Sequence, residues 1–443
     1  MQNRLVSVSL CCLAISALSG CGLFGKEPLD IDGDRINVIM ENKSLAPDIE
    51  VANTKIKLPP PYVNKSWNQN GGSSTHFMGH LQSAPKLKKL WNTDFGKGSS
   101  KRNHLIASPI SAYGAVFAID AEGVVTARRL DNGKEIWKKR LKPLNKKEKS
   151  SSLKGAGLAE YNQKIYATTG FGTVFCLDMK TGKIEWRKDI GTPIRIAPTV
   201  AAGKLLVQTF DNTLYALNIN NGEELWKNQT NSEETTLVGG ASPAYAPIHD
   251  LVVAAFSNGE LRAFKASTGT PLWGDMLSSK KRTNSLAAIE TIKANPIIEG
   301  DVVYAVGYNS VLTAIDIRTG SRIWERELGT TSQPWVAGNY LYVLTNDFEL
   351  LAMDKNSGKI IWNTSIPKGD DNDDKNGVFA SGPLLTDNRL LVTTSNGYIF
   401  SISPYTGRIM GYVSIDEGIE LSPIMAKGIG IFVNNDAEMT AYK

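Results

Sequence analysis

The residues that could carry out chemistry in this chain are few, beginning with its four histidines. His76 and His80 are four residues apart, a spacing that would pair them as metal ligands only on a helix, and Gly79 between them favours a turn. His104 and His249 stand alone. Such scattered histidines provide no nucleophile, base and orienting group, and no G-x-S-x-G motif occurs. The pattern therefore predicts no catalytic residues.

A second candidate is an oxygen-rich run of four aspartates and one asparagine, residues 370–374, which could hold calcium in principle. An EF-hand loop with Gly377 at its sixth position would need glutamate at its twelfth, where Pro383 stands. The run is therefore interpreted as a solvated acidic loop between strands. The sequence predicts no bound metal and no other cofactor.

A third candidate is a cysteine at the end of a signal sequence. Residues 1–20 hold one charge, Arg4, and an apolar stretch too short to span a bilayer but typical of a signal peptide. The stretch ends in Leu18-Ser19-Gly20-Cys21, which resembles the lipobox of bacterial lipoproteins. The resemblance implies cleavage before Cys21 and lipidation of Cys21. Because Gly22 rather than aspartate follows, it also implies anchoring at the periplasmic face of the outer membrane. The alternative is an ordinary signal peptide with a chance cysteine.

The remaining cysteines are too few for redox chemistry. Cleavage would remove Cys11 and Cys12, and lipid would occupy Cys21, so that Cys176 remains as a free thiol. Cys176 stands in an apolar, strand-like run, residues 174–177, and is predicted to be buried in the core rather than to act as a nucleophile.

Composition excludes further classes of function. Of 443 residues, 42% are hydrophobic, enough to bury a large core. The net charge of +5 is too small to indicate nucleic-acid binding. The densest basic stretch, residues 138–149, is interpreted as a solvated loop between the first two blades described below. Contact with anionic phospholipid or an acidic partner loop is the alternative.

An internal repeat defines the elements that must position these residues. Seven segments combine an alternating apolar strand, a polar turn ending in glycine, and a second strand that opens with tryptophan. The glycines, each four residues before the tryptophan position, are Gly133, Gly182, Gly222, Gly269, Gly320, Gly358 and Gly407. The tryptophans are Trp137, Trp186, Trp226, Trp273, Trp324 and Trp362, with Trp91 continuing the series backwards and Gly411 in the seventh position. A period of roughly 45 residues is typical of a four-stranded propeller blade. A glycine at a fixed position is typical of a turn that requires positive φ.

A second pattern gives the number of blades. A shorter strand pair, often opening with proline, precedes each module and occurs eight times. The eighth unit stops at the C-terminus without its outer strand, which Lys88–Phe95 could supply from the other end. The sequence therefore predicts an all-β fold: an eight-bladed β-propeller over residues 85–443, with four-stranded blades, closed by pairing the N-terminal strand with the C-terminal blade.

The chain between the lipobox and the propeller shows no such period. Residues 21–84 are irregular and broken by Pro59–Pro61 and Gly71–Ser74, so they are predicted to form a lipidated, extended tether. Trp67 and residues 76–81 could pack onto the propeller.

The repeat as it stands in residues 314–324 resembles the tryptophan-docking repeats of pyrroloquinoline-quinone (PQQ) dehydrogenases. A lipobox followed by little except this array is similar to the propeller lipoproteins of the outer-membrane β-barrel assembly (BAM) complex, as is the segment of residues 58–81. The resemblance covers the lipobox and about residues 85–443. It implies a non-catalytic scaffold that aids the folding and insertion of β-barrel proteins, with a lipid anchor as its membrane contact.

That resemblance also implies partners. In the family, loops between the third and fifth blades hold the POTRA domains of BamA, and unfolded outer-membrane proteins are possible further partners. The family stretch Leu-x-Leu-Arg-Gly corresponds best to residues 235–239, where Leu237 and Gly239 match and Val238 replaces the arginine. An apolar tip of Leu237 and Val238 could act as a small buried anchor. The alternative is that these residues merely begin an inner strand.

A second family feature, an acidic pair, falls near Thr291 and Lys293, where Glu290 is the acidic residue nearby. The implied partner-binding residues are therefore Leu237, Val238, Gly239 and Glu290, with the family's salt bridge lost or moved.

The competing interpretation is a periplasmic PQQ-dependent dehydrogenase. Enzymes that resemble this fold use Ca²⁺ held by carboxylate and amide oxygens, a catalytic aspartate and a vicinal disulfide. A mature chain with Cys176 as its free thiol cannot form an internal disulfide, which counts against redox catalysis.

Overall fold

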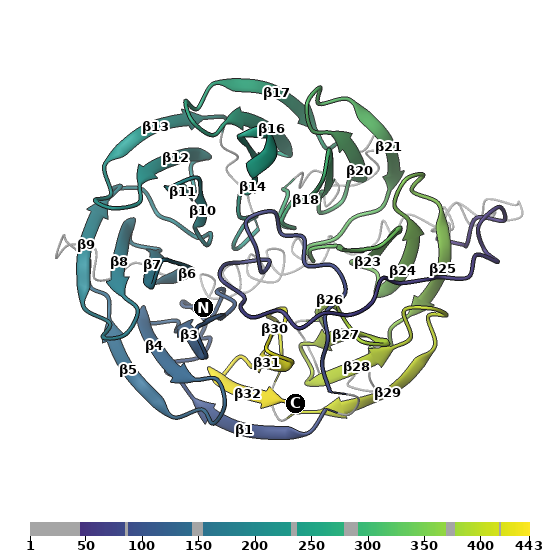
Figure 1. Ribbon diagram of the computed structural model, residues 1–443, viewed down its shortest axis with the longest axis horizontal. Helices are drawn as coiled ribbons and strands as arrows, with labels where there is room; N and C mark the ends of the chain where they lie inside the picture. Colours follow the sequence, from purple (N-terminus) through teal and green to yellow (C-terminus); the bar gives the residue numbers. More distant parts are fainter. Residues whose placement is uncertain are drawn as a thin grey trace, which may run out of the picture. The chain divides into compact units, whose positions relative to one another are not determined.

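The alternating apolar segments form eight four-stranded antiparallel sheets, arranged as blades in a ring around a central channel (Figure 1). This computed structural model describes residues 45–84, 87–143, 154–231, 237–278, 291–368, 377–415 and 418–443. Residues 45–443 belong to one compact unit. The prediction of an eight-bladed all-β propeller is confirmed.

Each blade runs from an inner strand beside the channel to an outer strand at the rim. Blade 1 comprises β2 (Ile110–Ala112), β3 (Ala115–Ile119), β4 (Val124–Arg129) and β5 (Glu135–Arg140). Blade 2 comprises β6 (Gly155–Tyr161), β7 (Lys164–Thr169), β8 (Thr173–Asp178) and β9 (Ile184–Asp189). Blade 3 comprises β10 (Thr199–Ala201), β11 (Lys204–Gln208), β12 (Thr213–Asn218) and β13 (Glu224–Gln229). Blade 4 comprises β14 (Ala244–Ala246), β15 (Leu251–Ala255), β16 (Glu260–Lys265) and β17 (Pro271–Met276), with the short 3-10 helix η2 (Pro247–His249) after β14.

The second half of the ring repeats the pattern. Blade 5 comprises β18 (Ile297–Glu299), β19 (Val302–Val306), β20 (Val311–Asp316) and β21 (Arg322–Glu327). Blade 6 comprises β22 (Trp335–Ala337), β23 (Tyr340–Leu344), β24 (Glu349–Asp354) and β25 (Ile360–Ser365). Blade 7 comprises β26 (Ala380–Thr386), β27 (Arg389–Thr394), β28 (Tyr398–Ile402) and β29 (Ile409–Ser414). Blade 8 comprises β30 (Ile424–Ala426), β31 (Ile429–Val433), β32 (Glu438–Tyr442) and, from the other end of the propeller, β1 (Lys89–Asp94).

The ring closes as the repeat count predicts. β1 pairs antiparallel with β32, and Trp91 lies opposite Ala441. This pairing supplies the outer strand that the C-terminal unit lacks, so blade 8 is complete and no blade is left with an unpaired third strand.

Neighbouring blades dock through the tryptophans. Seven indole N–H groups donate to a backbone carbonyl of the next blade at 2.7–3.2 Å. The turn glycine of that next blade lies against the ring: a Cβ on Gly182 would stand 2.6 Å from Trp137, and one on Gly358 2.5 Å from Trp324. Both glycines have positive φ, 67° and 68°. Glycine is therefore required at this turn for two reasons: the backbone has positive φ, and the indole occupies the space that a Cβ would need.

The missing tryptophan of the seventh unit coincides with a missing turn. Gly411 occupies the tryptophan register, opposite Ser401. The blade that would receive an indole there is blade 8, whose third strand ends near the C-terminus and whose fourth strand is β1. With no connecting turn between those two strands, blade 8 offers no glycine platform, so a tryptophan at Gly411 would have no docking site.

An N-terminal segment closes one end of the channel. Residues 62–81, here called the plug, cross the ring at the end where the inner strands finish, and Figure 1 shows the segment looping over the centre. Hydrogen bonds of 2.5–2.9 Å join the plug to all eight blades, through Ser111, Glu160, Val200, Tyr245, Ile298, Trp335, Asp387 and Met425. Within the range predicted as a tether, residues 45–84 therefore form part of the same compact unit as the blades.

The chain before the plug runs along the outer strand of blade 6. The backbone N–H of Asp48 donates to the Ile360 carbonyl at 2.8 Å, and the Asp48 carboxylate accepts from the Ile360 N–H at 2.7 Å. Arg326 on the neighbouring blade pairs with the same carboxylate. Among the described residues, no helix is long and apolar enough to span a membrane.

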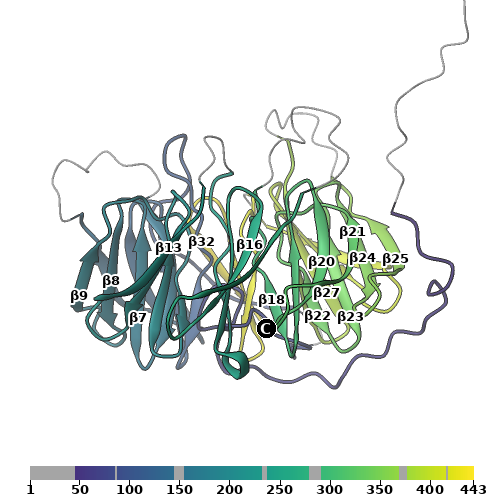
Figure 2. The same ribbon diagram turned by 90° about the horizontal axis from the view of Figure 1, so that it is seen from above.

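The two faces of the ring differ. Figure 2 shows the N-terminal segment along one face, with η2 on the same side. The described parts of the segments that lead from the outer strand of one blade to the inner strand of the next, such as residues 190–198 and 328–334, lie on the other face. The open end of the channel is therefore bordered by inter-blade segments.

Candidate functional site

The open end of the channel contains a cavity of about 380 Å³. Residues that precede or begin the inner strand of each of the eight blades form its wall, and the plug forms its floor through Trp67, Asn70 and Gly71. We call this cavity the funnel. Its volume lies in the range of sites that bind small molecules or single side chains.

The floor is a packed aromatic pair. Trp67 is 4% exposed and stacks on Trp335 of β22, with ring centroids 6.3 Å apart and an angle of 25° between the planes. The Trp67 backbone pairs with Ser111 of β2, and the Trp335 indole donates to the Gly79 carbonyl at 2.7 Å. Because both rings are tied to blades and plug together, the floor is fixed in place.

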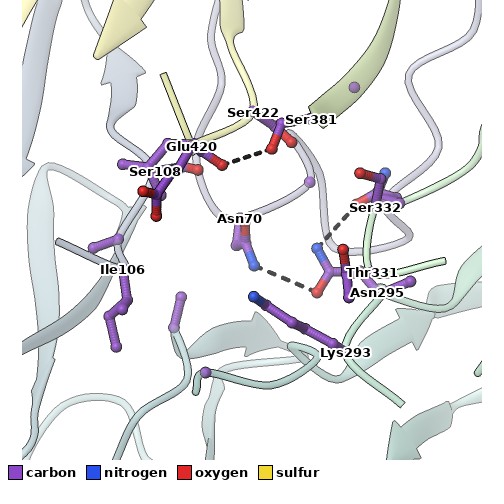
Figure 3. A pocket seen from close by; sticks show the side chains of 18 of the residues that line it. Asn70, Ile106, Ser108, Lys293, Asn295, Thr331, Ser332, Ser381, Glu420 and Ser422 are labelled. Carbon is purple, nitrogen blue, oxygen red and sulfur yellow. Dashed lines mark hydrogen bonds between the residues drawn. The ribbon is translucent and has the colours of Figure 1, made fainter. Parts of the chain in front are cut away.

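Side-chain amides form a connected chain above this floor. The Asn70 amide donates to the Ser242 hydroxyl at 2.9 Å and to Asn295 Oδ1 at 3.4 Å. Asn295 in turn donates to Gln333 Oε1 at 2.9 Å, and Gln333 donates to the His76 carbonyl at 3.0 Å. Figure 3 shows Asn70 and Asn295 joined across the cavity. The network holds polar groups at the cavity surface in defined orientations.

Two cations without a carboxylate partner line the funnel. Lys293, from the segment before β18, is half-buried and points into the cavity in Figure 3. Arg195, before β10, stacks over the Phe210 ring at 4.3 Å, and its buried Nε has no hydrogen-bond partner. Within the part of the chain that the structure describes, neither forms an ion pair.

Burial sets the electrostatics of both cations, and one carboxylate also acts on Lys293. Burial lowers the pKa of Lys293, and the charge of Glu420 acts in the opposite direction. Burial also lowers the pKa of Arg195. Glu420 lines the funnel too, and its Oε1 accepts a hydrogen bond from Asn435 at 2.8 Å. The funnel thus carries two desolvated positive charges and one carboxylate that is already hydrogen-bonded.

Two of the residues that the resemblance implies for partner binding, Val238 and Gly239, line the funnel, and Leu237 precedes them. Val238 is 42% exposed, Leu237 is half-buried, and Gly239 has a φ of 86°. A Cβ on Gly239 would stand 3.7 Å from Cε of Lys293, so the loop flanks the lysine. β14 begins only at Ala244, so these residues form a loop and do not begin the inner strand.

The other residues near the expected acidic pair do not offer a surface. Thr291 is buried, and its hydroxyl donates to the Ser257 carbonyl at 3.0 Å. Glu290 lies outside the described residues. Of the residues matched to the acidic pair or near it, the structure therefore places Lys293 at the funnel.

Cys176, His76 and His80 serve the fold, whereas His104 lines the funnel. Cys176 is fully buried on β8, and burial raises the pKa of its thiol to about 12, which confirms the prediction that it is a core residue. His76 Nδ1 lies 2.7 Å from the Pro296 carbonyl, and the ring nitrogens of His80 lie 2.6 Å from the carbonyls of Pro59 and Asp387. The described residues contain no group of three or more histidine, cysteine or acidic side chains placed to hold a metal.

Several predicted features lie outside the described residues: the signal peptide, Cys21, the acidic run of residues 370–374 and the part of the basic stretch that follows residue 143. The first part of that basic stretch is placed differently from the prediction. Residues 138–140 end β5 instead of forming a loop, because the alternating pattern of the strand continues past Trp137.

Sequence reasoning did not find the funnel, although one signal for it was present. In seven units the inner strand is preceded by a residue followed directly by proline. Six of these residues line the funnel: Ser108, Ala197, Asn295, Gln333, Gly382 and Ser422. Proline favours an extended backbone at the residue before it, which places that residue at the channel. Gly382, which lies inside β26 and has a φ of 122°, is the exception.

Comparisons with known proteins agree with this architecture. Residues 121–364, more than half of the chain, match the family model described as outer membrane protein assembly factor BamB. The BamB protein of Yersinia pestis is 26% identical over 342 residues, which cover 76% of this chain and 84% of that protein. The crystal structure of BamB from Moraxella catarrhalis superposes with a TM-score of 0.68 at 17% identity, covering 81% of this chain and all of that one.

The same propeller occurs in enzymes. The quinohemoprotein alcohol dehydrogenase of Comamonas testosteroni superposes with a TM-score of 0.66 at 14% identity, covering 85% of this chain and 80% of the enzyme chain. At this level of identity the likeness concerns the fold alone.

Proposed function

Because the chain belongs to the family of the outer membrane protein assembly factor BamB, we propose that it is a non-catalytic scaffold of the β-barrel assembly complex. It would bind the POTRA region of BamA and so aid the folding and insertion of β-barrel proteins, with unfolded outer-membrane proteins as further partners. The observation that carries the proposal is a closed ring of eight blades in which the described inter-blade residues lie on one face while the plug occupies the other.

A second part of the proposal concerns the membrane. Residues 1–20 would be removed as a signal peptide, and lipid on Cys21 would anchor the chain at the periplasmic face of the outer membrane. From Cys21 to Leu45, where the compact unit begins, the chain advances 24 residues, a contour length of roughly 80 Å at full extension. Such a tether raises the local concentration of partners on the same membrane.

The BamA contact is proposed for the loop of Leu237, Val238 and Gly239, together with Glu290, which lies outside the described residues. Val238 presents an exposed apolar side chain beside the funnel. An apolar residue of this kind can be buried at the centre of an interface, where desolvation gives it most of its effect.

Co-purification tests the proposal. BamA should be recovered with the tagged wild-type lipoprotein from detergent-solubilised envelopes, and Val238→Glu should reduce its recovery at least fivefold, because the substitution places a charge in an apolar contact. Ile248→Glu is the matched control, since Ile248 is an 87% exposed apolar residue on the plug face. Absence of every assembly component from the wild-type sample would refute the scaffold role, whereas equal recovery with both variants would refute only the proposed contact.

The alternative, a PQQ-dependent dehydrogenase, is favoured by the fold likeness to the Comamonas enzyme. It predicts dye reduction with an alcohol substrate after incubation with PQQ and Ca²⁺, together with the absorbance of bound quinone. Failure of both signals in a folded preparation would exclude this alternative.

A further inference from the structure

The funnel has features of a binding site that the scaffold role does not explain. Its cations have no carboxylate partner among the described residues, its amide network is ordered, and its floor is packed. An ammonium held partly out of water without an ion-pair partner is unfavourable unless a ligand compensates it. We propose that the funnel binds a single carboxylate carried on an extended peptide segment, with Lys293 as its principal counter-charge.

The charge of the lining selects a singly charged anion. Among the described lining residues, Lys293 and Arg195 contribute two positive charges and Glu420 one negative charge, which leaves one positive charge to be compensated. A carboxylate carries one negative charge at neutral pH, whereas a phosphate monoester carries 1.5 to 2. The second charge of a phosphate would face Glu420 without a further cation. The balance therefore favours a carboxylate.

Neutral donors and shape complete the site. The Ser422 hydroxyl lines the cavity and can donate to the second carboxylate oxygen, and Asn70 Oδ1 can accept from a peptide N–H. At the mouth, Val238 and Phe379 expose apolar side chains, and these residues are 42% and 58% exposed. A cavity of 380 Å³ admits a side chain with its flanking backbone but not a folded domain. An acidic residue within an extended segment meets these conditions.

Calorimetry on the purified lipoprotein in detergent tests the proposal. The probe is the peptide acetyl-Gly-Ser-Glu-Ser-Gly-amide, and the comparison ligands are the same peptide with glutamine, the same peptide with phosphoserine in place of glutamate, and free butyrate. The glutamate peptide should bind at least tenfold more tightly than the glutamine peptide and tighter than either other ligand. The glutamine peptide lacks the charge-assisted hydrogen bond, the phosphopeptide carries excess charge, and butyrate lacks the peptide contacts.

Three variants locate the site. Lys293→Met should weaken binding of the glutamate peptide about tenfold, and Glu420→Gln should strengthen it about threefold, because one removes the counter-charge and the other removes a repelling charge. Lys265→Met, at an exposed lysine on β16 that does not line the funnel, is the matched control and should leave affinity unchanged. Thermal unfolding of each variant confirms that it is folded.

The outcomes separate cleanly. Equal binding of the glutamate and glutamine peptides, or equal losses in Lys293→Met and Lys265→Met, would overturn the site. Butyrate binding as tightly as the glutamate peptide would overturn the peptide origin of the carboxylate, and tighter binding of the phosphopeptide would overturn the charge argument. The measurement involves no BamA, so its failure would leave the proposed scaffold role untouched.

Discussion

The two ends of the channel are built from the same eight inner strands and differ in whether their polar groups have partners within the chain. At the closed end, the plug provides hydrogen-bond partners to every blade, and its side chains Trp67, His76 and His80 are buried. At the open end, the wall combines apolar side chains with amides, hydroxyls, the Glu420 carboxylate and two cations that form no ion pair within the described chain. One end therefore resembles a protein core and the other a binding site.

This difference indicates that the closed end contributes mainly to stability and the open end mainly to function. A segment that bonds to all eight blades must unfold with them, so changes in it should lower the stability of the whole ring. Groups that remain without partners are unfavourable for folding and are retained where a ligand compensates them. Substitutions at the two ends should accordingly have opposite consequences, which the following predictions test from the largest effect to the smallest.

The largest effect is expected at the floor. Trp67→Ala should lower the free energy of unfolding by about 3–5 kcal/mol, because it removes a buried indole and leaves a cavity against Trp335. Phe379→Ala, at the mouth of the open end, should change stability by less than about 0.5 kcal/mol. Urea unfolding followed by tryptophan fluorescence and circular dichroism measures both. Equal losses would show that the two ends are not energetically distinct.

A smaller effect depends on pH. Burial lowers the pKa of His76 to about 4 from an ordinary value of 6.5, although its bond to the Pro296 carbonyl acts in the opposite direction. The unfolded chain therefore binds a proton more readily, so the stability due to neutral His76 is complete above pH 6.5 and is lost as the pH falls toward 4. The loss amounts to about 3 kcal/mol by pH 4.

His76→Asn isolates this term, since asparagine tolerates the positive φ of 58° at this position and does not titrate. The difference in unfolding free energy between wild type and variant should change by about 3 kcal/mol between pH 7 and pH 4. A pH-independent difference would mean that His76 is not buried in its neutral form and that the plug opens more readily than its bonds suggest.

A third prediction compares two equivalent turns. Gly338 and Gly300 join the first two strands of blades 6 and 5, and both have a φ of 58°. Alanine at either site should cost about 1–2 kcal/mol through backbone strain. A Cβ at Gly338 would also meet Cδ of Pro59 at 3.0 Å, whereas Gly300 faces open space. Gly338→Ala should therefore lower the melting temperature further than Gly300→Ala. Identical shifts would show that the N-terminal segment around Pro59 can move away without loss of stability.

The fold was predictable because its signals are local. A glycine and a tryptophan four residues apart define one turn and one docking contact, and counting the repeats gives both the number of blades and the split blade. The plug has no period, since each of its bonds goes to a different blade and its side chains follow no alternation. Sequence patterns therefore indicated an irregular segment but not its position across the channel.

The funnel was less predictable than the fold for a related reason. Arg195, Lys293 and Gln333 come from three blades, separated by 98 and 40 residues along the chain, and only ring closure brings them to one cavity. None belongs to a motif with its own spacing. The residue before each proline was the available signal, and it identified a position on every such inner strand without indicating which chemistry the position carries.

The smallest predicted effect has the opposite sign and lies at the open end. Lys293→Met should raise stability at pH 7 by less than about 1 kcal/mol, because it removes a half-buried charge that has no partner in the described chain. Burial lowers the pKa of Lys293 below its ordinary value of 10.5, so the folded chain releases this proton before the unfolded chain does. As the pH rises through the folded-state pKa toward 10.5, wild-type stability recovers relative to the variant, and the advantage of Lys293→Met should shrink. Melting temperatures at pH 7 and pH 9.5, with Lys265→Met as the control, measure this change. A loss of stability in Lys293→Met at pH 7 would mean that the lysine supports the fold, and the contrast between a structural end and a binding end would then fail at the residue on which it most depends.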